Sequence, residues 1–248
     1  MIIRLKKLNA TAMVILLFFA LVCSSVNVQA KEGNTVSDKA SHLIVIDPGC
    51  QSIESSKKES IGPGDWTRIT ENMTGATGAT TGIDECTLNL RVALKVQQLL
   101  KDSGYKVELT RSTNDVDMSN VDRAMFANTL EADLYISIHA SSQKSEDEGI
   151  LVLCETEDNP YNYKSYRNSR LLADTLLGSM AEKTSNKKYK VKETDELMGI
   201  NWCTIPNAVV VIGNLNNKAD EQLLNDTEYL QKVSDGIVSG IDSYFAQK

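Results

Sequence analysis

Histidine and closely paired cysteines, which often bind metals, are scarce in this sequence. It contains two histidines and five cysteines in 248 residues, and no two cysteines stand in a CxxC spacing. That spacing is typical of zinc ribbons and redox motifs, so neither is indicated. Four of the cysteines follow the first thirty residues. This even number permits disulfides, but a domain of this size does not need them, and free thiols or a single bridge are equally consistent with the sequence.

Positive charge is also in short supply. Lysine and arginine number 26 against 33 acidic residues, which gives a formal net charge of −7. Proteins that bind nucleic acids normally present an excess of positive charge, so we expect no nucleic-acid partner. No internal repeat is visible, and the one long apolar run lies near the N-terminus. Beyond that segment we expect no membrane-spanning helix.

Residues 1–30 have the pattern of a secretory signal peptide. Three basic residues precede the apolar run 13–22, and Val28-Gln29-Ala30 offers small residues where a signal peptidase reads. We therefore expect export, with the mature chain starting at the next residue. Cys23 invites a lipoprotein interpretation, but the bulky Val22 stands where lipidation signals usually have a small residue, so lipid anchoring is disfavoured.

After a polar lead-in over residues 31–42, apolar β-type runs alternate with helical patterns. The apolar runs lie at 43–46, 105–110, 132–139, 149–154, 189–191 and 207–212, and the helical patterns at 84–104, 119–130, 165–185 and 229–241. Such alternation predicts an α/β fold. We expect a single domain over 43–248, with a mostly parallel or mixed central sheet flanked by helices on both faces. Gly213 is expected to end the last strand.

Two of the predicted strands end on residues that can carry chemistry. The first stops at the turn Asp47-Pro48-Gly49-Cys50, and a later one ends at His139. The carboxyl ends of parallel strands share one edge of an open sheet, where ligands usually bind. Taken alone, His139 is equally consistent with a core histidine satisfied by hydrogen bonds. Glu85, in the first turn of the intervening helix, is by itself better explained by the helix dipole.

The segment 51–82 has no hydrophobic period and is rich in glycine, threonine and serine. Loops of this length inside a compact domain are usually either functional flaps or disordered insertions. The sequence leaves both interpretations open.

An ordered series of short motifs runs from about residue 43 to the C-terminus. Its members are Ile44–Gly49, Glu85 with Leu88-Asn89-Leu90, Thr110-Arg111 with Asp115, Arg123 with Ala127-Asn128, Ala132–Ala140 and Pro206–Asn217. In this order they resemble the zinc-dependent N-acetylmuramoyl-L-alanine amidases, and such a series is far more specific than any single motif. The resemblance implies a secreted, cell-wall-associated protein whose partner is peptidoglycan or its fragments. The family reaction is hydrolysis of the amide between N-acetylmuramic acid and L-alanine. We expect a monomer.

The resemblance also implies a metal set, and this chain departs from it twice. The family binds zinc through a histidine after Asp-Pro-Gly, a glutamate that opens the next helix, and the histidine of Ile-His-Ala; the corresponding residues here are Cys50, Glu85 and His139. A thiolate can bind zinc but makes it a weaker Lewis acid, so zinc is possible but weakened or lost. Val211 stands where the family has its catalytic glutamate. Losing a general base lowers rates by roughly 10²–10⁴-fold.

Three functional hypotheses follow. In the first, the chain is a family member with impaired or lost catalysis that acts by binding the wall or a partner. In the second, it is a working zinc amidase in which Cys50 is a ligand and another carboxylate, for example in the long loop, is the base. In the third, Cys50 and His139 form the nucleophile–base pair of a thiol hydrolase. His42 is rejected as a replacement ligand, because four strand residues, about 13 Å, separate it from Cys50.

Overall fold

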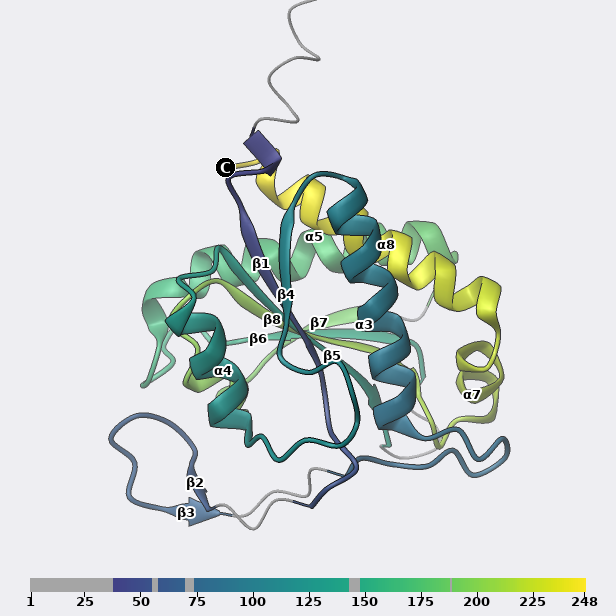
Figure 1. Cartoon of the computed structure of the whole chain (residues 1–248), viewed down its shortest axis with the longest axis horizontal. Helices are drawn as coiled ribbons and strands as arrows, with labels where there is room; N and C mark the ends of the chain where they lie inside the picture. The colour runs from purple at the N-terminus through teal and green to yellow at the C-terminus, as the bar shows by residue number, and fades with distance from the viewer. Residues whose placement is uncertain (1–37, 55–57, 70–73, 143–147, 188) are drawn as a thin grey trace, which may run out of the picture.

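A six-stranded mixed sheet forms the centre of the computed structural model, which describes residues 38–54, 58–69, 74–142, 148–187 and 189–248 (Figure 1). The strands of this sheet lie in the order β4-β1-β5-β8-β6-β7. Their bounds are β1 Leu43–Pro48, β4 Lys106–Leu109, β5 Leu134–Ser141, β6 Ile150–Cys154, β7 Tyr189–Glu193 and β8 Asn207–Asn214. The predicted signal peptide, residues 1–30, lies outside the described residues.

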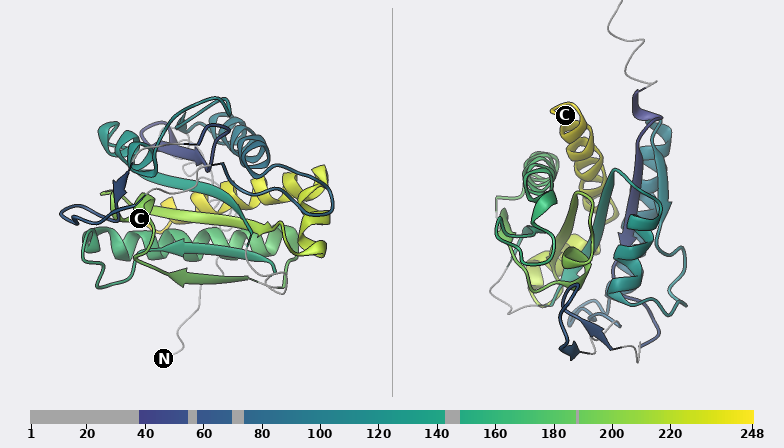
Figure 2. Two further views of the ribbon diagram at one scale, coloured as in Figure 1. Left: turned by 90° about the horizontal axis from the view of Figure 1, so that it is seen from below. Right: turned by 90° about the vertical axis from the view of Figure 1, so that its left-hand side faces the viewer.

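The sheet is parallel except at one junction. β1 pairs in parallel with β4 and β5, β5 with β8, and β6 with β7, whereas β6 runs antiparallel to β8. In Figure 2 (left) the arrows of β5 and β8 accordingly point one way and those of β6 and β7 the other. β8 does not end at Gly213 as predicted. The strand continues to Asn214, and its register with β5 shifts by one residue between His139 and Ser141.

Helices cover both faces of the sheet, which confirms the predicted fold class. The helices are α3 Glu85–Asp102, α4 Asn120–Thr129, α5 Tyr166–Thr184 after a 3₁₀ turn at Tyr163–Ser165, α6 Met198–Asn201, α7 Lys218–Leu224 and α8 Thr227–Phe245. The pleat of β1 shows the two layers: Ile44 and Ile46 join the large core under α3, α5 and α8, whereas Val45 packs with Ala124 and Ala127 of α4. Figure 1 shows α3 and α4 on opposite sides of β1.

Two predicted helix starts are capped as expected. Asp84 accepts a hydrogen bond from the Thr87 amide at 2.8 Å, and Ser119 forms a capping box with Asp122 at the start of α4. Among the residues described, no helix combines the length and apolar character that spanning a bilayer requires.

Helices α5 and α8 pack closely enough for their backbones to approach one another. A Cβ at Gly240 would lie 2.6 Å from Leu176 Cα, and one at Gly236 would lie 2.7 Å from Met180 Cα. Atoms do not approach that closely, so these two positions of α8 accept only glycine unless the helices move apart.

The described parts of the long loop, residues 51–54, 58–69 and 74–82, are tied to the rest of the domain by hydrogen bonds. Strands β2 Glu59–Ser60 and β3 Arg68–Ile69 form a small hairpin below α4 (Figure 1). The Glu59 carboxylate accepts hydrogen bonds from the amides of Asn120 (3.1 Å) and Val121 (2.8 Å) at the start of α4. Further along the loop, the Thr80 and Thr81 amides donate to Glu221 of α7.

Candidate functional site

The three predicted ligands gather at the carboxyl edge of β1 and β5. Cys50 follows β1, Glu85 opens α3, and His139 lies near the end of β5. His139 Nδ1 and Glu85 Oε1 are 3.3 Å apart. A Cβ at Gly75 would lie 2.8 Å from Cys50 Sγ and 3.1 Å from Glu85 Oε2, so one glycine is in contact with both side chains. The imidazole of His139 lies over Gly49, where any Cβ would collide with the ring.

Although they gather, the donor atoms do not converge on one point. Glu85 Oε1 faces His139 and accepts from Asn89 Nδ2 and the Ala140 amide, each at 3.3 Å. The second oxygen, Oε2, accepts from the Ala76 amide at 2.9 Å. Within the described ranges, no group of three His, Cys, Asp or Glu residues is arranged to hold a metal ion. A thiolate, a carboxylate and an imidazole suit zinc chemically, but as placed they do not fit the ion.

The charges at this corner favour an ionised Glu85 and a protonated Cys50. Burial alone would raise the pKa of Glu85, but a hydrogen bond and the facing charge from His139 outweigh it and lower the pKa. The pKa of Cys50 is raised, because its thiol shares a hydrogen bond with Cys86, is buried, and faces the Glu85 carboxylate. A raised pKa makes Cys50 a poor nucleophile near neutral pH.

Asp47 anchors the turn that carries Cys50. Its Oδ1 accepts from Arg123 Nη1 at 2.8 Å and from the Thr110 hydroxyl at 2.5 Å, and its Oδ2 accepts from the hydroxyls of Ser137 (2.6 Å) and Tyr135 (3.0 Å). Burial alone would raise the pKa of Asp47, but the Arg123 charge and these hydrogen bonds lower it to about 2. The carboxylate is therefore ionised in the folded protein at any ordinary pH.

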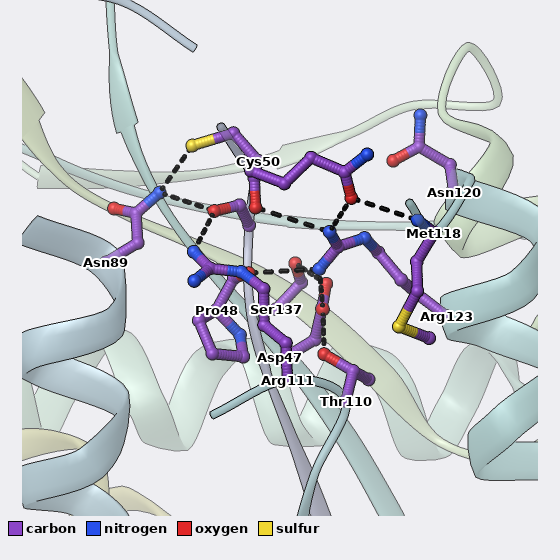
Figure 3. A network of polar contacts seen from close by, with 12 residues as sticks. Asp47, Pro48, Cys50, Asn89, Thr110, Arg111, Met118, Asn120, Arg123 and Ser137 are labelled. Atoms are coloured by element: carbon purple, nitrogen blue, oxygen red, sulfur yellow. Dashed lines mark hydrogen bonds and ion pairs between the residues drawn. The ribbon is translucent and has the colours of Figure 1, made fainter. Parts of the chain in front are cut away.

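Two buried arginines fix the backbone of the same turn, as Figure 3 shows. Arg111 donates to the carbonyls of Pro48 (2.8 Å) and Gly49 (2.9 Å). Arg123 donates to the carbonyls of Pro48 (3.0 Å) and Cys50 (3.2 Å). These bonds stabilise the left-handed backbone of Cys50, φ 52°, which a residue with a Cβ rarely adopts. The position of Cys50 Sγ therefore depends on two arginines, Arg111 and Arg123, that lie outside the turn.

A groove of about 870 Å³ begins at His139 and crosses the face of the sheet that carries α6. Its floor is apolar: Leu151, Leu153, Val209 and Val211 line it. Val211 is paired in register with His139 and is 8% exposed. The residue beside the histidine therefore presents methyl groups rather than a carboxylate. Lysines of β7, at the far side of the sheet, line the groove as well: Lys190 and Lys192.

Three residues whose contacts shape the site have no role that the sequence alone assigns. Cys86 meets Cys50, Asn89 bridges Glu85 Oε1 and Cys50 Sγ, and Arg111 fixes the turn. For Asn89 the sequence did contain a signal. It follows Glu85 by four residues, and residues four apart lie on the same face of a helix, so contact between the two side chains could have been predicted.

His42 lies at the opposite end of β1 from Cys50, as expected. Its Nδ1 is 3.6 Å from Asp133 Oδ2, and its ring stacks on Phe245 with centroids 4.0 Å apart. Both contacts are structural, and neither brings the ring toward Glu85 or His139.

Residues 44–243 match the sequence pattern described as N-acetylmuramoyl-L-alanine amidase. The chain belongs to this amidase family. The uncharacterized protein YqiI of Bacillus subtilis is 32% identical to it over 173 residues, which is 70% of this chain and 79% of YqiI.

Proteins named as amidases also share part of the sequence or the fold. The probable cell wall amidase LytH of Staphylococcus epidermidis is 28% identical over 158 residues, 63% of this chain, and the chain spans only 48% of LytH. The crystal structure of the N-acetylmuramyl-L-alanine amidase Ami1 from Mycobacterium smegmatis superposes with a TM-score of 0.74 at 22% identity, covering 85% of this chain and 99% of Ami1. That similarity shows the same fold.

Proposed function

We propose that this chain is an extracytoplasmic member of the amidase family that binds peptidoglycan and hydrolyses its amide bonds weakly or not at all. The observation that carries the proposal is Val211 in register with His139. Amides have poor leaving groups, so a base must take a proton from the attacking water and return it to the departing amine. Valine cannot do this. Cys50 at the position of the family's first histidine points the same way, because a thiolate makes zinc a weaker Lewis acid.

The groove supports retained binding of wall fragments. Its apolar floor can accept aliphatic groups of a peptide stem, and Lys190 and Lys192 stand where they can pair with the carboxylates of that stem. Both lysines are exposed, and they project from the same face of β7 because they are two residues apart. The groove therefore combines a hydrophobic floor with lysines at its β7 side, and Glu148 and Glu196 add carboxylates elsewhere in its lining.

The decisive test of impaired catalysis is a gain of function. We expect the double variant Cys50→His, Val211→Glu to acquire measurable amidase activity on peptidoglycan fragments, whereas wild type and each single variant stay near background. Groups that act as a unit have strongly non-additive effects, so a base without a metal, or a metal without a base, supplies too little. Val211→Glu buries a carboxylate, so folding and zinc content must be measured in all four proteins.

Two outcomes would contradict the proposal. Wild type turning over as fast as the double variant would mean that the natural chain is an active amidase. A folded, zinc-containing double variant without activity would mean that the groove no longer accepts the family substrate.

Binding is tested separately by sedimentation with insoluble peptidoglycan. Lys190→Glu together with Lys192→Glu should reduce the bound fraction several-fold. The matched control is Arg91→Glu together with Lys95→Glu, which makes the same charge change on exposed positions of α3. Equal loss of binding in both variants would point to a general charge effect rather than to the groove.

An active zinc amidase with Cys50 as ligand is the second candidate, because a thiol, a carboxylate and an imidazole do meet at one corner. It needs another base. Two acidic residues of the long loop are engaged elsewhere, Glu59 at α4 and Asp65 with the Thr67 amide and the Tyr161 hydroxyl, while Glu148 and Glu196 line the groove. Stoichiometric zinc in wild type that is lost in Cys50→Ser would favour this candidate.

A further inference from the structure

Cys50 and Cys86 meet where β1 ends and α3 begins. Both side chains are buried, 5% and 1% exposed, and both sulfurs lie against the same point of the long loop. A Cβ at Gly75 would be 2.8 Å from Cys50 Sγ, and Cys86 Sγ is 3.0 Å from the carbonyl oxygen of Thr74, the preceding residue. Cys86 Sγ also lies 3.4 Å from the carbonyl oxygen of Gln51, the residue after Cys50. All four cysteines in the described part of the chain are free thiols, and Cys154 and Cys203 belong to two separate core clusters.

A rigid polar frame holds this thiol pair. Arg111 Nη2 donates to two carbonyls at once, Gly49 at 2.9 Å and Cys86 at 3.0 Å, so one nitrogen joins the backbone on both sides of the pair. Asn89 Nδ2 adds contacts to the Gly49 carbonyl at 3.3 Å and to Cys50 Sγ at 3.7 Å. Disulfides require a narrow range of backbone separations and Cβ directions. Because Arg111 Nη2 holds the Gly49 and Cys86 carbonyls at the same time, the backbones that carry the two thiols are fixed next to each other.

We propose that Cys50 and Cys86 form an intramolecular disulfide when the chain meets a disulfide oxidant, either a small one or the active-site disulfide of a thiol oxidoreductase. One protein thiolate attacks the oxidant's S–S bond, giving a mixed disulfide and releasing one oxidant thiolate. The second protein thiolate then attacks the mixed disulfide at the protein sulfur and releases the other. The protein loses two protons and two electrons, and the electrons reduce the oxidant to two thiolates.

This disulfide would change what the corner can bind. Once its sulfur is bonded to Cys86, Cys50 no longer offers a thiolate, and the predicted metal set is reduced to Glu85 and His139. The bond would also join the turn after β1 to the first turn of α3, on either side of the long loop. The inference does not depend on the proposed function, because the bond forms whether or not the chain cleaves peptidoglycan.

The test is a disulfide map of the mature chain refolded in a mixture of reduced and oxidised glutathione. Refolding gives the oxidant access to thiols that are buried in the native state. Free thiols are then alkylated, and the protein is digested and analysed by mass spectrometry without reduction. We expect one cross-linked peptide pair that contains Cys50 and Cys86, with Cys154 and Cys203 alkylated. The same map on folded chain, kept in that mixture until the pattern stops changing, should give the same pair.

Matched variants check the assignment. Cys86→Ser should leave Cys50 without a cross-link, whereas Cys154→Ser, in a different part of the core, should keep the Cys50–Cys86 pair. Recovery of Cys50 as an alkylated or glutathione-bound residue in refolded wild type, or its pairing with Cys154 or Cys203, would overturn the proposal. If a variant does not fold, the disulfide map of wild type alone still tests whether Cys50 and Cys86 are bonded.

Discussion

Asp47 is the residue on which the geometry of the Cys50 turn most depends. Its ion pair with Arg123 is almost fully buried, with side chains 2% and 1% exposed. We expect Asp47→Asn to lower the free energy of unfolding by about 3–5 kcal/mol, because it leaves a buried guanidinium without its counter-charge. Chemical denaturation measures the change. Asp174→Asn removes an exposed partner of Arg170 and should change stability by less than about 1 kcal/mol.

The same carboxylate predicts a pH dependence with a definite sign. The pKa of Asp47 falls from 3.8 to about 2 on folding, so the folded protein binds this proton less well than the unfolded chain does. Its contribution, about 2 kcal/mol, is fully present above pH 4 and is lost as the pH falls toward 2. The stability difference between wild type and Asp47→Asn should shrink over that interval. A difference that stays constant between pH 5 and 2 would contradict the assignment.

At the residue scale, the sequence predicted where side chains gather but not how they point. Cys50, Glu85 and His139 come together because each stands at the end of a strand or the start of a helix, and those positions can be read from periodicity and capping. The direction of Cys50 Sγ depends on Cys86, Asn89 and two arginines from other elements. No local pattern encodes such contacts.

The contact between α5 and α8 gives an element-scale test with an internal control. Gly240→Ala should destabilise the protein by about 1–3 kcal/mol, because its methyl group would meet Leu176 Cα and force the helices apart. Gly178→Ala, in the middle of α5, has open space and should stabilise by about 0.5–1 kcal/mol through helix propensity. Thermal or chemical unfolding measures both. Equal effects of the two substitutions would mean that the packing is looser than described.

Glu59 links the β2–β3 hairpin to α4 and predicts a local effect. Glu59→Ala removes the acceptor of the Asn120 and Val121 amides and should cost about 1 kcal/mol, as loss of a helix cap does. Hydrogen exchange should accelerate at those two amides before it does elsewhere. Glu54→Ala, at an exposed position of the same loop, is the control. Unchanged exchange at Asn120 and Val121 would show that Glu59 does not cap α4.

The six strands of the main sheet and the long helices were predicted from the sequence, whereas the shortest elements were not. Helices α3, α5 and α8 repeat apolar residues every three or four positions and lie where that pattern placed them. Strands β2 and β3, with two residues each, and the four-residue α6 have no measurable period. Contacts with other parts of the chain set their positions, such as the bond from Trp202 Nε1 to the Ser60 carbonyl.

At the scale of the whole molecule, the order of the strands and the direction of each strand could not be predicted from the sequence. Alternation of strands and helices predicts an α/β sheet, and this is confirmed. The antiparallel pairing of β6 with β8 could not be predicted, because an apolar run has the same pattern whether its strand runs parallel or antiparallel to its neighbour.

Export remains a prediction at this scale. Protein recovered from the native host should lie outside the cytoplasmic membrane and should begin at Lys31, since the first thirty residues have the signal-peptide pattern. N-terminal sequencing or intact mass measures this directly. An intact N-terminus would mean that the apolar run is a membrane anchor rather than a cleaved signal.

The position of β8 between β5 and β6 has a consequence for how the chain assembles in time. β8, residues 207–214, is the strand that joins β4-β1-β5 to β6-β7. The corner with Cys50, Cys86 and His139 belongs wholly to the first part, whereas the groove floor needs β8. In a chain that emerges N-terminus first, all the residues of this corner are therefore available before β8 is, and we expect the two thiols to meet before the sheet closes. If the chain is exported as predicted, we therefore expect an oxidant outside the membrane to reach them most readily during emergence.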